Sequence, residues 1–121
     1  PVVLSVGRVA PSKRVEDTIK AFTLYQRRRA PAARLVLIGS DDGFEEYRVA
    51  LDRLAERIGT SGVVFTGRIS DADRDGWYRR ADAYLCMSSH EGFCAPLVEA
   101  MARGVPVVAR DAGAVRETIG G

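Results

Sequence analysis

The chain has 121 residues, of which 46% are hydrophobic and 28% are charged, and its formal net charge is +2. This composition indicates one soluble globular domain with a real core, and it argues against a disordered chain or a membrane span. The near balance of 18 basic and 16 acidic residues gives no reason to expect a nucleic-acid or membrane partner.

The two cysteines, Cys86 and Cys94, indicate a reduced setting, so we expect a cytoplasmic location. They lack the paired spacing of a zinc site and are too few for a disulfide scaffold. The chain begins at Pro1 without an initiator methionine or a signal peptide, and we therefore expect a domain of a longer protein.

Five short apolar runs rich in β-branched residues predict buried strands. Continuous rather than alternating apolar runs are typical of a parallel sheet that is covered on both faces. The five predicted strands are residues 2–6, 35–38, 63–65, 83–87 and 105–109.

Helical patterns fill the gaps between these runs. Apolar residues recur three and four positions apart in segments 15–22 and 47–58, so each segment has one stripe that can pack on a sheet. Three further helices are expected: a weaker one after Ser70-Asp71 that includes Trp77, Tyr78 and Ala81, one over 96–103 that ends at Gly104, and one near Gly113. The alternation predicts an α/β fold, a doubly wound parallel sheet between layers of helices, with ligands at the carboxyl ends of the strands.

The segment 91–99 has two carboxylates eight positions apart, Glu91 on a glycine loop and Glu99 in a helix opened by Pro96. The free N–H groups at such a helix start attract phosphate, so Glu99, one turn further on, is expected to accept from the two hydroxyls of a ribose. Glu91 would accept from a second sugar, and the pair predicts a nucleotide-sugar site. A glycosidase acid and base is the alternative, but its carboxyls must face each other across the bond.

Two cations follow the first predicted strand. They are expected at the carboxyl edge of the sheet, where the Glu91 loop is also expected. Arg8 follows Gly7, and Lys13 comes five residues later. An arginine fork and a lysine point charge can stabilise a leaving diphosphate without a metal. By themselves two such cations are more often plain surface charges, and Gly7 can be a plain turn residue; the 91–99 segment favours the binding role.

Other candidate residues give weaker signals. Gly67 and Arg68 follow the third predicted strand, where a base could bond to the main chain or where a simple loop could lie. His90 has no partner set for a metal, and it is the one plausible base for Cys94 as a nucleophile. Glu117 is either a helix-surface charge or part of the pocket lip.

Several segments together resemble a known family. Residues 88–108, with the E-x7-E spacing of Glu91 and Glu99, are similar to the C-terminal domain of retaining GT-B glycosyltransferases of family 4, also called group 1. The similarity extends in chain order to Lys13 and to segments 6–8, 35–39, 64–67 and 78–83. It implies a Rossmann-like sheet, the C-terminal half of a GT-B fold.

The resemblance also implies roles, residue by residue. Residues 1–121 would bind a nucleotide-diphosphate sugar, with Arg8 and Lys13 on the diphosphate, Glu91 on the donor sugar and Glu99 on the ribose. Of these, Glu91, Arg8 and Lys13 would act on the reacting groups. The segment that contacts sugar and phosphate oxygens would contain Gly92, Phe93, Cys94, Ala95 and Leu97.

The implied reaction transfers a glycosyl group to an acceptor with retention of the anomeric configuration. Attack from the front face, with the leaving phosphate helping to take the acceptor proton, would need no divalent metal or other cofactor. The acceptor would bind mainly to a preceding domain, so the isolated piece, which also lacks a closing C-terminal helix, is expected to be inactive. Any peripheral membrane association would come only through those missing parts.

Two departures and several alternatives stay open. Cys94 and Ala95 stand where glycine and leucine are common in the family, and Arg14 stands where glycine is usual. A dinucleotide-dependent oxidoreductase would show G-x-G-x-x-G after the first strand, whereas Gly7 precedes Arg8-Val9-Ala10. A non-catalytic nucleotide-sugar-binding module, a nucleotide-sugar epimerase or a glycogen-type synthase remains an alternative.

Overall fold

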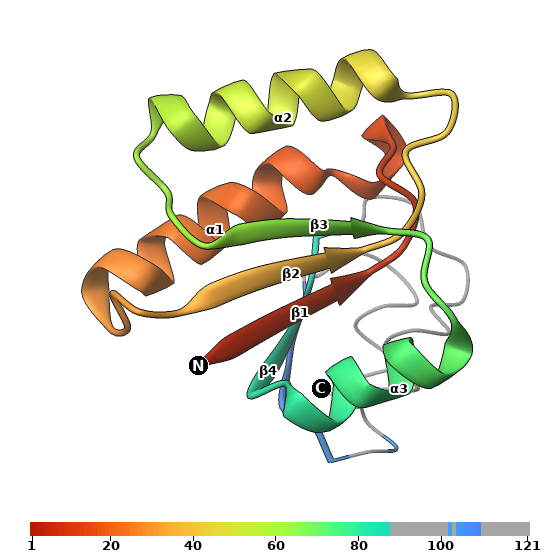
Figure 1. Cartoon of the computed structure of the whole chain (residues 1–121). Helices are drawn as coiled ribbons and strands as arrows, with labels where there is room; N and C mark the ends of the chain where they lie inside the picture. Colours follow the sequence, from red (N-terminus) through yellow and green to blue (C-terminus); the bar gives the residue numbers. More distant parts are fainter. Residues whose placement is uncertain (88–101, 103, 110–121) are drawn as a thin grey trace.

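The structure is a computed structural model that describes residues 1–87, 102 and 104–109. Its described part is a five-stranded parallel sheet with helices on both faces (Figure 1). The elements in chain order are β1 (Val2–Val6), the 3-10 helix η1 (Pro11–Lys13), α1 (Val15–Arg28), β2 (Arg34–Ile38), α2 (Glu45–Arg57), β3 (Val63–Gly67), α3 (Asp71–Arg80), β4 (Ala83–Cys86) and β5 (Val107–Ala109). The predicted doubly wound α/β fold is therefore confirmed.

The strand order is β3-β2-β1-β4-β5, so the direction of winding reverses between β1 and β4. The chain moves outward from β1 to β3 and then returns through α3 to the other side of β1. There β4 pairs with β1, with Val3 opposite Ala83 and Leu4 opposite Tyr84. The carboxyl ends of β1 and β4 consequently lie next to each other, and ligands of such sheets bind at this kind of reversal.

Each face of the sheet has its own apolar core. One core lies under α1 and α2, where Ile19 and Phe22 of α1 pack with Leu35, Leu37 and Leu85. The other core lies on the α3 side, as the two helix layers in Figure 1 indicate. In that second core the Tyr78 ring of α3 stacks on the Tyr84 ring, with centroids 6.2 Å apart. Burial on both faces explains the continuous apolar runs of the strands.

The observed elements differ from the predicted ones mainly at their ends. β5 begins at Val107 rather than at residue 105, because Pro106 has no N–H to donate to a strand partner. The Pro106 carbonyl still accepts from the Tyr84 N–H at 2.8 Å, and Val105 is buried in the core under α3. Met87 lies beyond the end of β4.

The helix boundaries follow local backbone chemistry. Ser70 precedes α3 as an N-cap, and its hydroxyl accepts from the Asp73 N–H at 3.1 Å, as the Ser70-Asp71 start predicted. Ile58 and Ala81 are the cap residues that end α2 and α3 rather than parts of their last turns. The predicted helix over 96–103 lies outside the described residues except for residue 102, and the one near Gly113 lies outside them entirely.

In the part of the chain that the structure describes, no helix combines the length and the apolar character that crossing a membrane requires.

Candidate functional site

The candidate site is the carboxyl edge of the sheet, where the loops after β1, β2 and β3 begin. Each of these strands ends in or is followed by a glycine: Gly7, Gly39 and Gly67. The chain also leaves β4 at this edge, directly beside the end of β1. Because parallel strands all run in one direction, the topology gathers these four exits along one edge.

The loops after β1 and β2 are packed backbone against backbone. The Gly7 N–H donates to the Ile38 carbonyl at 2.8 Å, and the Val9 N–H donates to the Ser40 carbonyl at 2.9 Å. A β-carbon on Gly39 would lie 1.9 Å from the Gly7 carbonyl oxygen, and Gly39 has a φ of +149°. Only glycine allows this approach, so the base of the site is a rigid pair of loops.

Lys13 lies over the end of β1. A β-carbon added to Gly7 would be 3.8 Å from the Lys13 Cε atom and 4.0 Å from its Cδ atom. The short helix η1 turns the chain back after Arg8 and ends at Lys13, which brings the lysine stem over Gly7. A cation therefore stands at the carboxyl end of β1, as the sequence predicted.

Arg8 is exposed and lies toward β2. Its Nη2 donates to the Asp42 carbonyl oxygen at 3.3 Å, and its Cζ atom lies 5.3 Å from the centre of the Phe44 ring. Both partners belong to the loop between β2 and α2. Arg8 and Lys13 thus occupy the same edge, but Arg8 rests on the β2 side of β1, away from the exit of β4.

Arg14, which stands where the resemblance implies glycine, has an unusual backbone conformation. It is the one non-glycine residue with positive φ among those the structure describes, at φ 52° and ψ 47°, and it links η1 to α1. This left-handed conformation favours glycine, the residue that the resemblance implies at this position. The Arg14 guanidinium is paired with the Asp17 carboxylate at 2.8 Å, which offsets part of the strain.

A tyrosine braces the helix that follows Lys13. The Tyr47 hydroxyl of α2 donates to Glu16 at 2.7 Å and accepts from the Val15 N–H at 3.1 Å, at the first turn of α1. Burial, reinforced by the Glu16 carboxylate, raises the pKa of Tyr47 to about 12. The start of α1 has no capping side chain of its own, so Tyr47 satisfies an N–H that would otherwise lack a partner.

Of the predicted site residues, Gly67 and Arg68 lie on the same edge as Gly7 but two strands away, because β2 separates β3 from β1. Arg68 is exposed, and the Gly67 carbonyl accepts from the Gly39 N–H at 3.2 Å. The remaining predicted residues lie outside the described residues: His90, Glu91, Gly92, Phe93, Cys94, Ala95, Leu97, Glu99 and Glu117.

Sequence reasoning missed the contribution of the loop between β2 and α2. The Asp42 contact uses a main-chain carbonyl, which every residue type has, so no sequence signal marks it. Phe44 was detectable only as an aromatic residue just before a predicted helix, which is commonly a packing residue. Among residues 1–87, 102 and 104–109, no group of three or more histidine, cysteine or carboxylate side chains could hold a metal ion.

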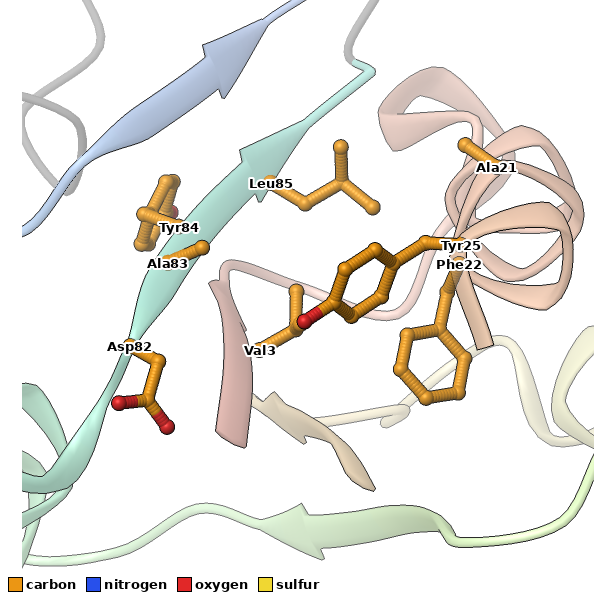
Figure 2. Close-up of a pocket in the computed structure, with 8 residues that line it drawn as sticks. All are labelled: Val3, Ala21, Phe22, Tyr25, Asp82, Ala83, Tyr84 and Leu85. Carbon is orange, nitrogen blue, oxygen red and sulfur yellow. The ribbon is translucent and has the colours of Figure 1, made fainter. Parts of the chain in front are cut away.

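An apolar hollow of about 230 Å³ lies elsewhere, between α1 and the sheet. Figure 2 shows Phe22 and Tyr25 of α1 facing Val3 of β1 and Leu85 of β4 across it. The hollow also reaches Asp82, which precedes β4 and therefore marks the amino edge of the sheet. Its position and its apolar lining separate it from the two cations at the carboxyl edge.

The comparison with protein families decides the class of the chain. Residues 1–120 match the model of glycosyl transferases group 1. This chain belongs to that family. Its relatives include mannosylfructose-phosphate synthase of Agrobacterium fabrum, which is 37% identical over 88% of this chain, and a GDP-mannose-dependent alpha-mannosyltransferase of Mycolicibacterium smegmatis, which is 37% identical over 98%. The chain spans 24% and 28% of the length of these two group 1 relatives.

Solved structures of glycosyltransferases share the fold. Anabaena Alr3699/HepE, crystallised with UDP and glucose, superposes with a TM-score of 0.83 at 29% identity, over 96% of this chain and 31% of its own. Sucrose-phosphate synthase of Thermosynechococcus elongatus superposes with a TM-score of 0.82 at 30% identity, over 97% of this chain and 29% of its own. The group 1 chain described here therefore has a Rossmann-like α/β sheet of the kind found in GT-B glycosyltransferases.

Proposed function

We propose that residues 1–121 form the donor-binding, C-terminal domain of a retaining family 4 hexosyltransferase of the GT-B type. The domain binds a nucleotide-diphosphate sugar, and the glycosyl group passes to an acceptor with its anomeric configuration kept. The observation that carries the proposal is the position of Lys13 and Arg8 at the carboxyl end of β1, the strand from which the winding reverses, with Arg8 on its β2 side. Membership of the glycosyl transferases group 1 family supports it.

The two cations suit a diphosphate leaving group. Lys13 offers a compact point charge over Gly7, and Arg8 offers a planar fork on the β2 side. Breaking the bond between sugar and phosphate places negative charge on the departing diphosphate. Fixed cations at that position stabilise this charge more in the transition state than in the ground state, which is the condition for catalysis. We propose that they do so without a divalent metal.

The remaining roles follow the segment after β4. Glu91 would hold the donor sugar, Glu99 the ribose, and the backbone of residues 92–97 the sugar and phosphate oxygens. The pairing of β4 with β1 supports this assignment, because the chain enters the segment beside Gly7. A donor that spans the edge toward β3 would bring its base near Gly67 and Arg68.

The donor class is supported by what the relatives bind. The Anabaena structure contains UDP and glucose, and one mycobacterial relative is named for its dependence on GDP-mannose. We infer a nucleotide-diphosphate sugar as the donor without choosing its base. The relatives are several times longer than this chain, and we propose that a preceding domain binds the acceptor, so that turnover in the cytoplasm needs the whole protein.

Titration of the full-length protein with UDP-, GDP- and ADP-sugars tests the proposal. Glu99→Ala should weaken the binding of both nucleoside and nucleotide, because a ribose contact is lost. Lys13→Ala should remove the preference for a nucleoside diphosphate over the nucleoside. Lys20→Ala is the matched control, since Lys20 is exposed on α1 and lies away from the edge. Unchanged affinity in both Glu99→Ala and Lys13→Ala would overturn the site assignment.

A further inference from the structure

The loop between β2 and α2 holds Arg8, which itself lies in the loop after β1. The backbone on either side of Arg8 is fixed, since the Gly7 and Val9 N–H groups both donate to carbonyls at the end of β2. The guanidinium then meets the Asp42 carbonyl and the Phe44 ring. Main chain and side chain of Arg8 are therefore attached to the same neighbouring loop.

That loop is itself braced. The Asp42 N–H donates to the Ser40 hydroxyl at 3.0 Å, and the Phe44 N–H donates to the Asp41 carbonyl at 2.8 Å. Phe44 is also the residue from which α2 begins, and its carbonyl accepts from the Arg48 N–H at 3.0 Å. The ring over which Arg8 lies is thus fixed to the start of a 13-residue helix.

The geometry points to Phe44 as a positioning residue that, together with the Asp42 carbonyl, orients the Arg8 guanidinium for the diphosphate of the donor. This inference rests on the proposed function. A guanidinium has five N–H donors, and the Phe44 ring, which has no oxygen or nitrogen acceptor, takes up none of them in a conventional hydrogen bond. Among the residues that the structure describes, the Asp42 carbonyl takes one, and we infer that the others serve phosphate oxygens.

Orientation before binding matters because a free arginine side chain loses much rotamer freedom when it is fixed by a ligand. A side chain already held in position loses less, so the same phosphate contact gives tighter binding. A cation–π contact at an exposed site corresponds to about a two- to five-fold change in affinity. This is the effect that we expect from Phe44.

The test measures affinity of the full-length protein for UDP and GDP, and for uridine and guanosine, by calorimetry. Phe44→Ala should weaken nucleoside diphosphate binding by about two- to five-fold and leave nucleoside binding unchanged. Phe44→Leu should behave like Phe44→Ala, since it keeps apolar bulk but no ring face. Phe44→Tyr, which keeps the ring, should retain the affinity.

A double-mutant comparison separates positioning from general structure. In an Arg8→Ala background, Phe44→Ala should have no further effect on diphosphate affinity. An equal effect in both backgrounds, or an unchanged or increased affinity in the single variant, would overturn the inference. If Phe44→Ala fails to fold, Phe44→Leu decides by the same criteria. A protein that binds no nucleoside diphosphate, or one in which Arg8→Ala changes nothing, would instead refute the proposed site and this inference with it.

Discussion

Gly39 lies so close to Gly7 that a β-carbon on Gly39 would be 1.9 Å from the Gly7 carbonyl oxygen. This contact joins the loops at the ends of β1 and β2, from which Arg8 and Phe44 extend. The arrangement of the candidate site therefore depends on a residue that has no side chain.

Gly39→Ala should lower the free energy of unfolding by about 3 kcal/mol, because the new methyl group forces the two loops apart and φ at this residue is positive. Gly76→Ala is the control: a β-carbon there meets nothing within 4 Å, and Gly76 lies in α3. Alanine in a helix should be neutral or stabilising by about 1 kcal/mol. Urea unfolding measures both, and equal stability of the two variants would contradict the packing described.

Arg14 should tolerate glycine better than a β-branched residue. Its left-handed backbone costs a non-glycine residue about 1 kcal/mol, which Arg14→Gly would regain while losing the partly buried pair with Asp17. We expect Arg14→Gly to remain within about 1 kcal/mol of the parent protein and Arg14→Val to lose more. Asp17→Ala removes the ion pair but keeps arginine at position 14, so its effect on the free energy of unfolding measures the pair alone. Equal unfolding midpoints for the glycine and valine variants would show that the conformation at residue 14 is not as described.

Tyr47→Phe should lower the free energy of unfolding by about 1 kcal/mol at neutral pH, since the hydroxyl bonds to Val15 and Glu16 are lost. The pKa of Tyr47 is raised to about 12, so the unfolded chain loses this proton at a lower pH than the folded protein does. The contribution of Tyr47 is therefore present below pH 10 and is lost as pH rises toward about 12.

Unfolding of the parent protein and of Tyr47→Phe over this alkaline range checks the sign. The difference in stability between them should shrink as pH rises. A difference that stays constant or grows would contradict the position of the hydroxyl.

Much of the fold could be predicted because a parallel sheet that is buried on both faces requires continuous apolar runs in its strands, and these are visible in the sequence. The run of residues 2–6 became β1 with the same bounds, and the Ser70 cap correctly marked the start of α3. The start of β5 was predicted two residues too early, because Val105 is apolar as part of the core under α3 and not as part of a strand. Periodicity records which side chains are buried and not which backbone groups pair.

The candidate site could be predicted only in part, because contacts between loops are not visible in the sequence. Charge and glycine after the first strand correctly placed Lys13 at the carboxyl edge of the sheet, since the topology of the fold brings that edge together. The contacts of Arg8 with Asp42 and Phe44 depend on how two loops pack. One of them uses a main-chain carbonyl, which every residue type has, so the sequence does not indicate it. Such long-range loop contacts arise from tertiary structure.

The most direct test of the account is a crystal structure of the full-length protein with a bound nucleoside diphosphate. We expect the diphosphate at the carboxyl end of β1, with the Lys13 ammonium and the Arg8 guanidinium both within hydrogen-bond distance of phosphate oxygens. A diphosphate bound at the amino edge of the sheet, or one that contacts neither cation, would contradict it.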